Sequence, residues 1–306
     1  MDRTRTISFL MNGAASNVQM DEIVLRAKTT LPEFLCNFFL TRSLRDLDDA
    51  LAQVTAMNSE ALVIAGGDGT INKTLPFLKE FKIPIYIYPA GTANDLARQL
   101  GTTKNFKQMR SCIMQNRSQK LDLIFVNGVP FVTGGGIGIG AKLTRYINEV
   151  RKTYPGFKKL MRLAGGHFYT WAAVEQILTG SNETRKYSII SDNDSSEIET
   201  GNMFISNQPK IGGDLLLSPD ALNNDGLLDV VAFKANRLPD LIKSFSALKL
   251  GLPLPDISRF QAKKFEIIAH DQRPIMAFGD GEALVEAPHL IFEVHPAALT
   301  VFVGQK

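Results

Sequence analysis

Residues 61–70 read Ala-Leu-Val-Ile-Ala-Gly-Gly-Asp-Gly-Thr, and the helix-like stretch Ile-Asn-Lys-Thr-Leu-Pro-Phe-Leu follows at residues 71–78. An apolar run that ends in glycines before a helix start is typical of a β-strand that leads through a tight turn into a helix. Backbone N–H groups at such a turn face an anion, so the turn predicts a phosphate-binding site. It lacks the Gly-Lys-Ser/Thr ending of a Walker A loop and has Asp68 where that loop places its lysine, which favours work on a metal or a proton.

The chain from residue 7 to about 126 alternates β-like and helical runs around this turn. Residues 20–31 and 44–57 have the apolar spacing of helices, and Ser43 is suited to cap the second. This alternation predicts a parallel sheet flanked by helices, a Rossmann-like nucleotide-binding α/β domain at residues 1–126 whose ligands bind beyond the carboxyl ends of the strands. The expected strands are residues 7–11, 37–40, 61–65, 83–88 and 121–126.

The pattern changes after residue 127. The glycine-rich residues 134–140 read as a loop that leads into a helical region at about 141–179, interrupted near Pro155. From residue 185 onward, short β-like runs separated by turn residues predict a mostly antiparallel β-sandwich with one helix at about 239–250. We therefore expect a second domain at residues 127–306, whose last few residues can pack back on the first. The expected strands are residues 187–191, 203–207, 227–233, 264–269 and 290–294.

Composition is that of an ordinary globular protein. Of 306 residues, 44% are apolar and 21% charged, and the net charge of only +3 argues against nucleic-acid binding. Two distant cysteines argue against a disulfide framework or a zinc site and fit a reducing cytoplasm. The N-terminal apolar run is shorter than the roughly 7–15 residues of a signal-peptide core, and no run approaches the roughly 20 residues that span a bilayer. The sequence thus predicts a cytoplasmic protein whose membrane contact is peripheral.

Two further acids stand where ligands bind in such a sheet. Residues 89–98 follow a strand and open a helix, so Thr92 is placed to donate to a phosphate and Asp95 to bind metal-associated water; a simple helix cap is the alternative. Asp122 interrupts an apolar strand, where its carboxylate either belongs to the ligand site or lies at the end of the strand in contact with solvent. Together with Asp68, these carboxylates predict a magnesium site at the sheet edge.

Two turns in the second half carry carboxylates. Asp280-Gly281-Glu282 reads either as a hairpin turn or as the place where a carboxylate accepts the proton of an acceptor hydroxyl in phosphoryl transfer. Residues 221–227 read first as a tight turn, which also sets the Asp225 carboxylate among backbone carbonyls that suit a partly hydrated cation. The sequence has neither the His-Glu-x-x-His pattern of a zinc protease nor the Gly-x-Ser-x-Gly elbow of a serine hydrolase.

Residues 142–162 form a basic segment in which Glu149 is the only acid. Apolar and aromatic residues lie among and after its cations, so the segment could dock on an anionic bilayer by charge and insertion. A helix pair with one solvated basic face is the alternative. The cations are Lys142, Arg145, Arg151, Lys152, Lys158, Lys159 and Arg162.

These motifs occur together in one order along nearly the whole chain. Residues 66–72, 89–95 and 224–226 and the trio at 280–282 resemble the diacylglycerol-kinase-like catalytic family, and most of all its bacterial YegS-like lipid kinases. A lone Gly-Gly-Asp-Gly-Thr would also suit NAD kinase. Residues 12–16 read Asn-Gly-Ala-Ala-Ser instead of the Asn-Pro-x-Ser-Gly of many relatives; the YegS-like branch also begins this loop with Asn-Gly, and the part of the loop in nucleotide binding stays open.

The resemblance implies a lipid kinase that binds ATP between its domains, requires Mg²⁺, and phosphorylates a hydroxyl of a membrane lipid such as phosphatidylglycerol or diacylglycerol. Glu282 matches the family's proton acceptor, with Asp280 as its rival, and Asp68 is expected to organise Mg-ATP. The residues expected around the nucleotide are Thr41, Gly66, Gly67, Asp68, Gly69, Thr70, Ile71, Asn72, Thr92 and Asp95.

The resemblance also implies a structural metal site formed by the Leu222 and Leu227 carbonyls and the Asp225 carboxylate, for Mg²⁺ or alternatively Ca²⁺ or Mn²⁺. The sequence leaves the lipid and the oligomeric state open. Two other functions compete with the lipid kinase: a NAD-kinase-like small-molecule kinase, and a catalytically weak nucleotide or lipid sensor. Residues 89–98 and the trio at 280–282 argue against the first of these, and the retained acidic set against the second.

Overall fold

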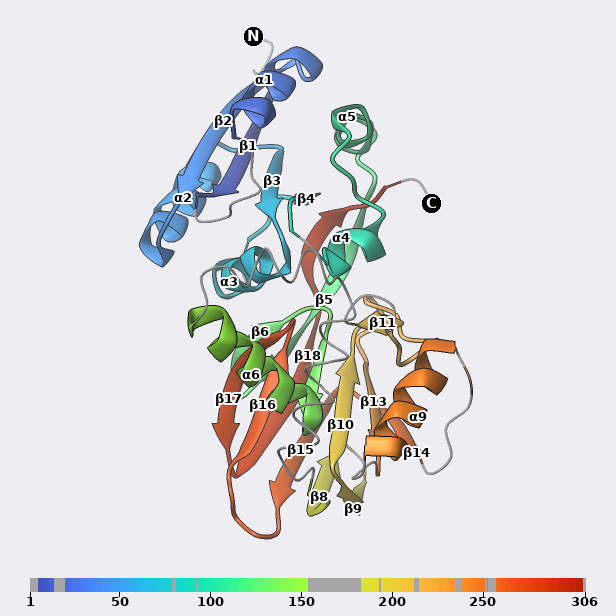
Figure 1. Cartoon of the computed structure of the whole chain (residues 1–306). Coiled ribbons are helices and arrows are strands. Elements are labelled where there is room, and N and C mark those ends of the chain that lie inside the picture. Colours follow the sequence, from blue (N-terminus) through green and yellow to red (C-terminus); the bar gives the residue numbers. More distant parts are fainter. Residues whose placement is uncertain are drawn as a thin grey trace. The chain divides into compact units, whose positions relative to one another are not determined.

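The computed structural model describes residues 5–13, 20–78, 81–91, 93–153, 183–192, 194–211, 215–234, 238–250, 252 and 257–304. The chain divides into two compact units (Figure 1). Unit 1 comprises Met1–Asp122 and Ala297–Lys306, and unit 2 comprises Leu123–Pro296. Two strands, β5 and β18, have residues in both units.

Unit 1 contains a parallel sheet with the strand order β2-β1-β3-β4, and Val301 at the end of β18 pairs with Ile85 of β4. Helices α1 and α5 contribute Ile23 and Met109 to the core that surrounds Phe9, whereas α2 contacts β2 and α3. The expected sheet flanked by helices is confirmed. The elements are β1 (Arg5–Asn12), α1 (Met20–Thr30), β2 (Phe34–Thr41), α2 (Leu44–Ala56), β3 (Ala61–Gly66), α3 (Asp68–Leu78), β4 (Ile85–Pro89), α4 (Asp95–Leu100), α5 (Phe106–Met114), β5 (Ser118–Val126) and the end of β18 (His289–Phe302).

The strand order of unit 1 reverses at β1, because β2 lies on one side of it and β3 on the other. In parallel sheets such a reversal opens a crevice beyond the carboxyl ends of the two diverging strands. Here those ends are Asn12 of β1 and Gly66 of β3. The predicted cap of α2 is also confirmed, because Ser43 Oγ accepts a hydrogen bond from Asp46 N at 3.1 Å and the Asp46 carboxylate accepts one from Ser43 N.

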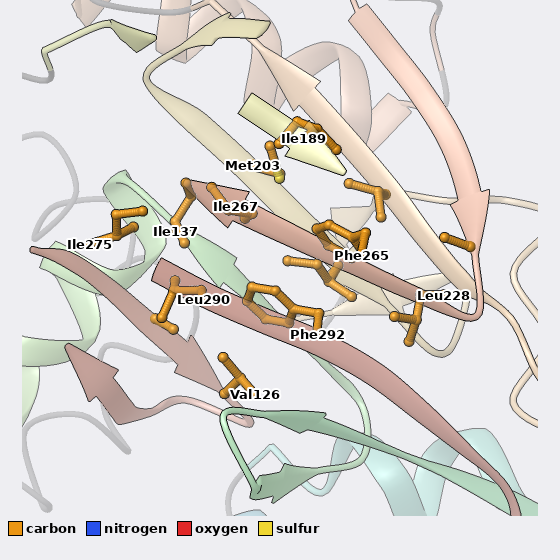
Figure 2. Packing of buried hydrophobic residues seen from close by; sticks show 14 of the residues in the cluster. Val126, Ile137, Ile189, Met203, Leu228, Phe265, Ile267, Ile275, Leu290 and Phe292 are labelled. Atoms are coloured by element: carbon orange, nitrogen blue, oxygen red, sulfur yellow. The ribbon is translucent and has the colours of Figure 1, made fainter. Parts of the chain in front are cut away.

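Unit 2 is built from two antiparallel layers. One sheet has the order β14-β13-β10-β7-β16-β17, and the other layer has the order β18-β15-β8-β9, with β5 and β6 beside β18. Apolar residues from both layers form one core, in which the rings of Phe265 and Phe292 stack with centroids 5.1 Å apart (Figure 2). The expected sandwich is confirmed. The elements are β6 (Val129–Phe131), β7 (Gly134–Ile137), α6 (Ile139–Thr153), β8 (Arg185–Ser191), β9 (Ser195–Thr200), β10 (Asn202–Ser206), β11 (Lys210–Ile211), β12 (Leu215–Leu216), β13 (Leu228–Phe233), α9 (Leu238–Leu250), β14 (Ile257–Ala262), β15 (Lys264–Ala269), β16 (Ile275–Gly279) and β17 (Glu282–Ala287).

The expectation of a glycine-rich loop at 134–140 is wrong. Residues 134–137 form β7, which pairs with β10 and β16 in the interior of its sheet. A Cβ on Gly135 would collide with the carbonyl oxygen of Phe278, and one on Gly136 with that of Met203, so only glycine lets the neighbouring strands come this close. The following helix, α6, begins at Ile139, and residues 154–179 of the predicted helical region lie outside the described residues.

Candidate active site

The glycine turn after β3 is the first half of the candidate site. Helix α3 begins at Asp68, which places a carboxylate in the first turn, where the helix dipole favours negative charge. The N–H groups of Thr70 and Ile71 donate to the Gly67 carbonyl at 2.8 and 3.1 Å. A phosphate at this turn would therefore accept hydrogen bonds from the backbone N–H groups that precede Thr70.

The turn packs directly against the second predicted loop. A Cβ on Gly67 would lie 2.7 Å from Gly91 Cα, and one on Gly91 would lie 2.5 Å from Gly67 Cα. Ala90 N donates to Gly66 O at 2.9 Å, which extends the pairing of β3 and β4 into the loops. The two motifs thus lie side by side at one sheet edge, and both glycines are required because the two backbones touch. Thr92 lies outside the described residues.

Asn94, rather than Asp95, closes the second loop. Asn94 has a positive φ of 51°, accepts a hydrogen bond from Gly91 N at 2.8 Å and donates one to Gly91 O at 2.9 Å. It makes no side-chain capping bond to α4. Asp95 begins α4 and forms an ion pair with Arg98, which lies one turn later. A cation bound by Asp95 would have to compete with this guanidinium.

The expected magnesium cluster of Asp68, Asp95 and Asp122 does not form. Within the described ranges, no group of three or more His, Cys, Asp or Glu side chains is placed to hold a metal ion. Asp122 is 1% exposed, and its Oδ1 accepts a hydrogen bond from Ala297 N at 2.7 Å. A buried acid needs such a partner, so Asp122 links β5 to the chain segment that returns through β18.

Polar side chains lie at the ends of two neighbouring strands, and one of them contacts the glycine turn. Asn12 and Thr41 are paired in register at the ends of β1 and β2. Asn12 Nδ2 donates to Thr70 Oγ1 at 3.0 Å, and Thr41 Oγ1 donates to Met11 O at 3.4 Å. Asn12, whose loop the sequence left open, thus contacts the turn directly. Its Asn-Gly dipeptide at a strand end was the signal that could have placed it there.

Asp280 and Gly281 form the turn of the β16–β17 hairpin, in which Gly279 pairs with Glu282. Both turn residues have positive φ angles, 50° and 75°, as the type I′ turn of a two-residue hairpin loop requires. The Asp280 carboxylate accepts hydrogen bonds from Val132 N at 3.0 Å, Thr133 N at 2.8 Å and Thr133 Oγ1 at 2.6 Å. Asp280 therefore ties the hairpin to the segment between β6 and β7.

Glu282 begins β17, directly after the turn, and is half-buried. Asn148 Nδ2 of α6 donates to Glu282 Oε2 at 3.0 Å. This partner is neutral, unlike the guanidinium that pairs with Asp95. Sequence reasoning missed Asn148, because no local pattern connects two residues that lie so far apart in the chain.

The turn at 222–227 contains Asp225, which the sequence predicts as a cation ligand. Asp225 Oδ1 accepts a hydrogen bond from Leu227 N at 3.0 Å, and Gly226 has a φ of 73°. Burial raises the pKa of the nearby Asp229 carboxyl, and the charges of Asp220 and Asp225 contribute to the rise. A carboxylate, backbone carbonyls and a negative local field are what Mg²⁺ or Ca²⁺ prefers.

In the described part of the basic segment, acidic side chains offset some of the positive charge. Arg145 Nη2 lies 2.6 Å from Glu286 Oε2, and the charge of Glu183 acts on Lys142, whose pKa is nonetheless lowered, chiefly by burial. The side chains of residues 151 and 152, and residues 158–162 entirely, lie outside what the structure describes. No helix of the described part of the chain is long and apolar enough to cross a bilayer.

Comparisons with known families match both units. A diacylglycerol kinase catalytic domain matches residues 6–126, and a YegS C-terminal NAD kinase beta sandwich-like domain matches residues 137–303. In the fold comparison, a crystal structure of a diacylglycerol kinase from Bacillus anthracis (strain Sterne) has a TM-score of 0.70 at 19% identity, over 99% of this chain and 98% of that chain. The match to the YegS C-terminal domain covers more than half of the chain, which is enough to assign the chain to this family.

Curated relatives are similar in sequence to this chain over most of their length. A probable YegS-like lipid kinase of Shewanella frigidimarina is 27% identical over 96% of this chain and 92% of its own length. A diacylglycerol kinase of Mycobacterium tuberculosis is 28% identical, and a probable YegS-like lipid kinase of Klebsiella pneumoniae is 30% identical, each over 84% of this chain and 81% of its own length. The chain therefore belongs to the YegS-like, diacylglycerol-kinase-like family of lipid kinases.

Proposed function

We propose that this protein transfers the γ-phosphoryl group of ATP to a hydroxyl of a membrane lipid, of the phosphatidylglycerol or diacylglycerol kind, in a reaction that depends on Mg²⁺. The names of its relatives support a lipid as the acceptor. The observation that carries the assignment of roles is the hairpin at 280–282. There both oxygens of the Asp280 carboxylate accept hydrogen bonds from the 132–133 segment, and the Glu282 carboxylate accepts one from the Asn148 amide at Oε2.

In this reaction the acceptor hydroxyl gives its proton to the Glu282 carboxylate while its oxygen forms a bond to the γ-phosphorus. The bond between that phosphorus and the β–γ bridging oxygen breaks, and ADP leaves. Asp280 is a poor base because both of its oxygens already accept hydrogen bonds from the 132–133 segment. Its role is to hold the hairpin.

The nucleotide half of the reaction is assigned to unit 1. The turn at residues 66–72, Asn12, Thr41 and Thr92 surround the phosphates in this proposal, with Asp95 at its margin because of the Arg98 ion pair. Asp68, in the first turn of α3, would hold the magnesium of Mg-ATP, because a carboxylate is a ligand that Mg²⁺ prefers. Bound Mg²⁺ supplies neutralisation of the charge that develops on the phosphates.

Two further features of unit 2 belong to the proposal. The Leu222 and Leu227 carbonyls and the Asp225 carboxylate would hold a second cation that braces the turn before β13. The basic segment would bring the protein to an anionic bilayer, which supplies the lipid acceptor.

A direct test is phosphate transfer from [γ-³²P]ATP to vesicles made from a total bilayer extract, with mass spectrometry of the labelled product. We expect a labelled lipid with the wild type and a loss of about 10²–10⁴-fold in kcat with Glu282→Gln, the range typical of a general base. Glu286→Gln is the matched control, because it makes the same chemical change on the same strand at an exposed position.

Absence of lipid labelling by folded wild-type protein would overturn the proposal, as would efficient phosphorylation of NAD in lipid-free buffer. Nucleotide binding without transfer in a single turnover would favour a sensor instead. If Glu282→Gln keeps full activity while Asp280→Asn loses it without a loss of folding, the roles of the two acids are reversed.

A further inference from the structure

Helix α6 brings an amide to the candidate base. Asn148 lies in the third turn of α6, and its Nδ2 donates to Glu282 Oε2 at 3.0 Å. The assignment of the donor follows from chemistry, because an ionised carboxylate only accepts hydrogen bonds and the amide nitrogen is the donor that Asn offers. In Figure 1, α6 crosses β16 and β17, and it contacts both strands.

The backbone of α6 is fixed by packing. Ile139 N at its start donates to Oδ1 of the fully buried Asn202 at 3.1 Å. Ile139 and Ala141 belong to the same buried cluster as Phe278 of β16, and Ile147, next to Asn148, is 4% exposed. The amide of Asn148 therefore comes from a rigid element, which is the condition for a side chain to orient a neighbour.

The contact with Asn148 restricts the Glu282 side chain. A glutamate has three side-chain torsions, and this one begins a strand whose side chains at 283 and 286 are exposed. A hydrogen bond to one carboxylate oxygen restricts these torsions and fixes the plane of the group. A Lys or Arg in the same place would fix it as well, but its charge would also favour the ionised carboxylate and so weaken it as a base. The hydrogen bond of a neutral amide also favours the ionised carboxylate, but less than a full positive charge does, and it leaves the other carboxylate oxygen outside this contact.

We propose that Asn148 is a positioning residue that holds the Glu282 carboxylate in the orientation in which it accepts the proton of the lipid hydroxyl. The inference rests on the proposed function, since it assigns Asn148 a part in that reaction. It predicts an effect on the chemical step and none on nucleotide binding, because Asn148 contacts the proposed base and is not among the residues assigned to the nucleotide.

The test compares Asn148→Leu, which keeps the size of the side chain and removes the donor, with the wild type in the lipid-labelling assay. We expect kcat to fall about tenfold, the worth of one orienting hydrogen bond, with the KM for ATP and the melting temperature unchanged. Asn148→Asp, which also keeps the shape of the side chain, should lower kcat further because two carboxylates then face each other. In a Glu282→Gln background, Asn148→Leu should have no additional effect on kcat.

Glu286→Gln is the control for a purely structural role, because it breaks the Arg145–Glu286 ion pair between α6 and β17 and leaves the Asn148–Glu282 contact in place. A kcat within twofold of wild type for both Asn148 variants would overturn the inference, as would an equal fall with Glu286→Gln. A wild type that transfers no phosphate to lipid would count against the proposed function itself. An active wild type with an inactive Glu282→Gln variant and normal Asn148 variants would count against the inference alone.

Discussion

Replacing Asp280 by alanine should destabilise unit 2 strongly, although the residue lies in a surface turn. The substitution removes the acceptor of two backbone N–H groups, on Val132 and Thr133, whose residues are only 2% and 6% exposed. Each buried donor left without a partner costs about 1–3 kcal/mol, so the two together give a loss of about 4 kcal/mol in the free energy of unfolding. At about 2–4 °C per kcal/mol for a unit of this size, the melting temperature should fall by about 8–16 °C.

Two further substitutions separate the contributions. Asp280→Asn keeps one acceptor oxygen and a side chain that tolerates positive φ, so about half of the loss should remain. Asp280→Gly loses the same hydrogen bonds as alanine but relieves the backbone at φ 50°, and should be about 1 kcal/mol more stable than Asp280→Ala.

Thermal denaturation followed by circular dichroism measures all three variants. A melting temperature for Asp280→Ala within about 2 °C of wild type would refute the role of the hydrogen bonds, since even one unsatisfied donor should cost at least that much. An alanine variant more stable than the glycine variant would refute the backbone argument. At a temperature where Asp280→Asn stays folded, it should retain most of the kinase activity, in contrast to Glu282→Gln.

Three other perturbations have defined outcomes. Gly91→Ala, whose Cβ would lie 2.5 Å from Gly67 Cα, should push the two loops apart, cost about 1–3 kcal/mol as overpacking and raise the KM for ATP in steady-state assays; an unchanged KM would contradict the close contact. Burial raises the pKa of Tyr86 to about 12 and that of Cys36 to about 11, so the folded state holds both protons longer than the unfolded state does. The contribution of these two groups to the free energy of unfolding is therefore fully present below their pKa values in the unfolded state, 9.0 for Cys36 and 10.0 for Tyr86. It is lost as the pH rises through their pKa values in the folded state. Urea titrations in which Tyr86→Phe loses as much stability at alkaline pH as the wild type would disprove the assignment to Tyr86. Mg²⁺ or Ca²⁺ in large excess over its dissociation constant should raise the melting temperature of wild type but not of Asp225→Ala, and an equal rise in both would place the cation elsewhere.

Local rules predicted the fold of unit 1 well. The run at 61–65, the glycine turn and the start of α3 follow from composition over ten residues, because a strand, a turn and a helix start each have their own residue preferences. The same rules failed at 134–137, where glycines form a central strand. The cause there is non-local: the carbonyl oxygens of Phe278 and Met203, from strands distant in the chain, leave no space for a Cβ.

The acidic residues show the same difference between what the local sequence predicts and what distant segments determine. Asp122 looked like a ligand because an unpaired buried carboxylate is costly, but its partner is the N–H group of Ala297, which lies near the other end of the chain. The contact of Asn148 with Glu282 was equally invisible. A carboxylate in a motif can be recognised from the sequence, whereas the group that neutralises or orients it depends on which distant segment the fold brings beside it.

The trio Asp280-Gly281-Glu282 left a choice between a hairpin turn and a functional carboxylate, and the proposed function gives the first role to Asp280 and the second to Glu282. A two-residue turn with positive φ angles accepts Asn-Gly as readily as Asp-Gly, so turn formation alone does not call for an aspartate. The two N–H groups and the hydroxyl of the 132–133 segment do, because one carboxylate supplies acceptors for all three. Asp280 thereby fixes the hairpin from one side, and Asn148 on α6 contacts Glu282 from another element. If Glu282 is the base, as proposed, then contacts from two segments distant in the chain restrict its position more than the turn alone would, which is what proton transfer from a bound hydroxyl requires.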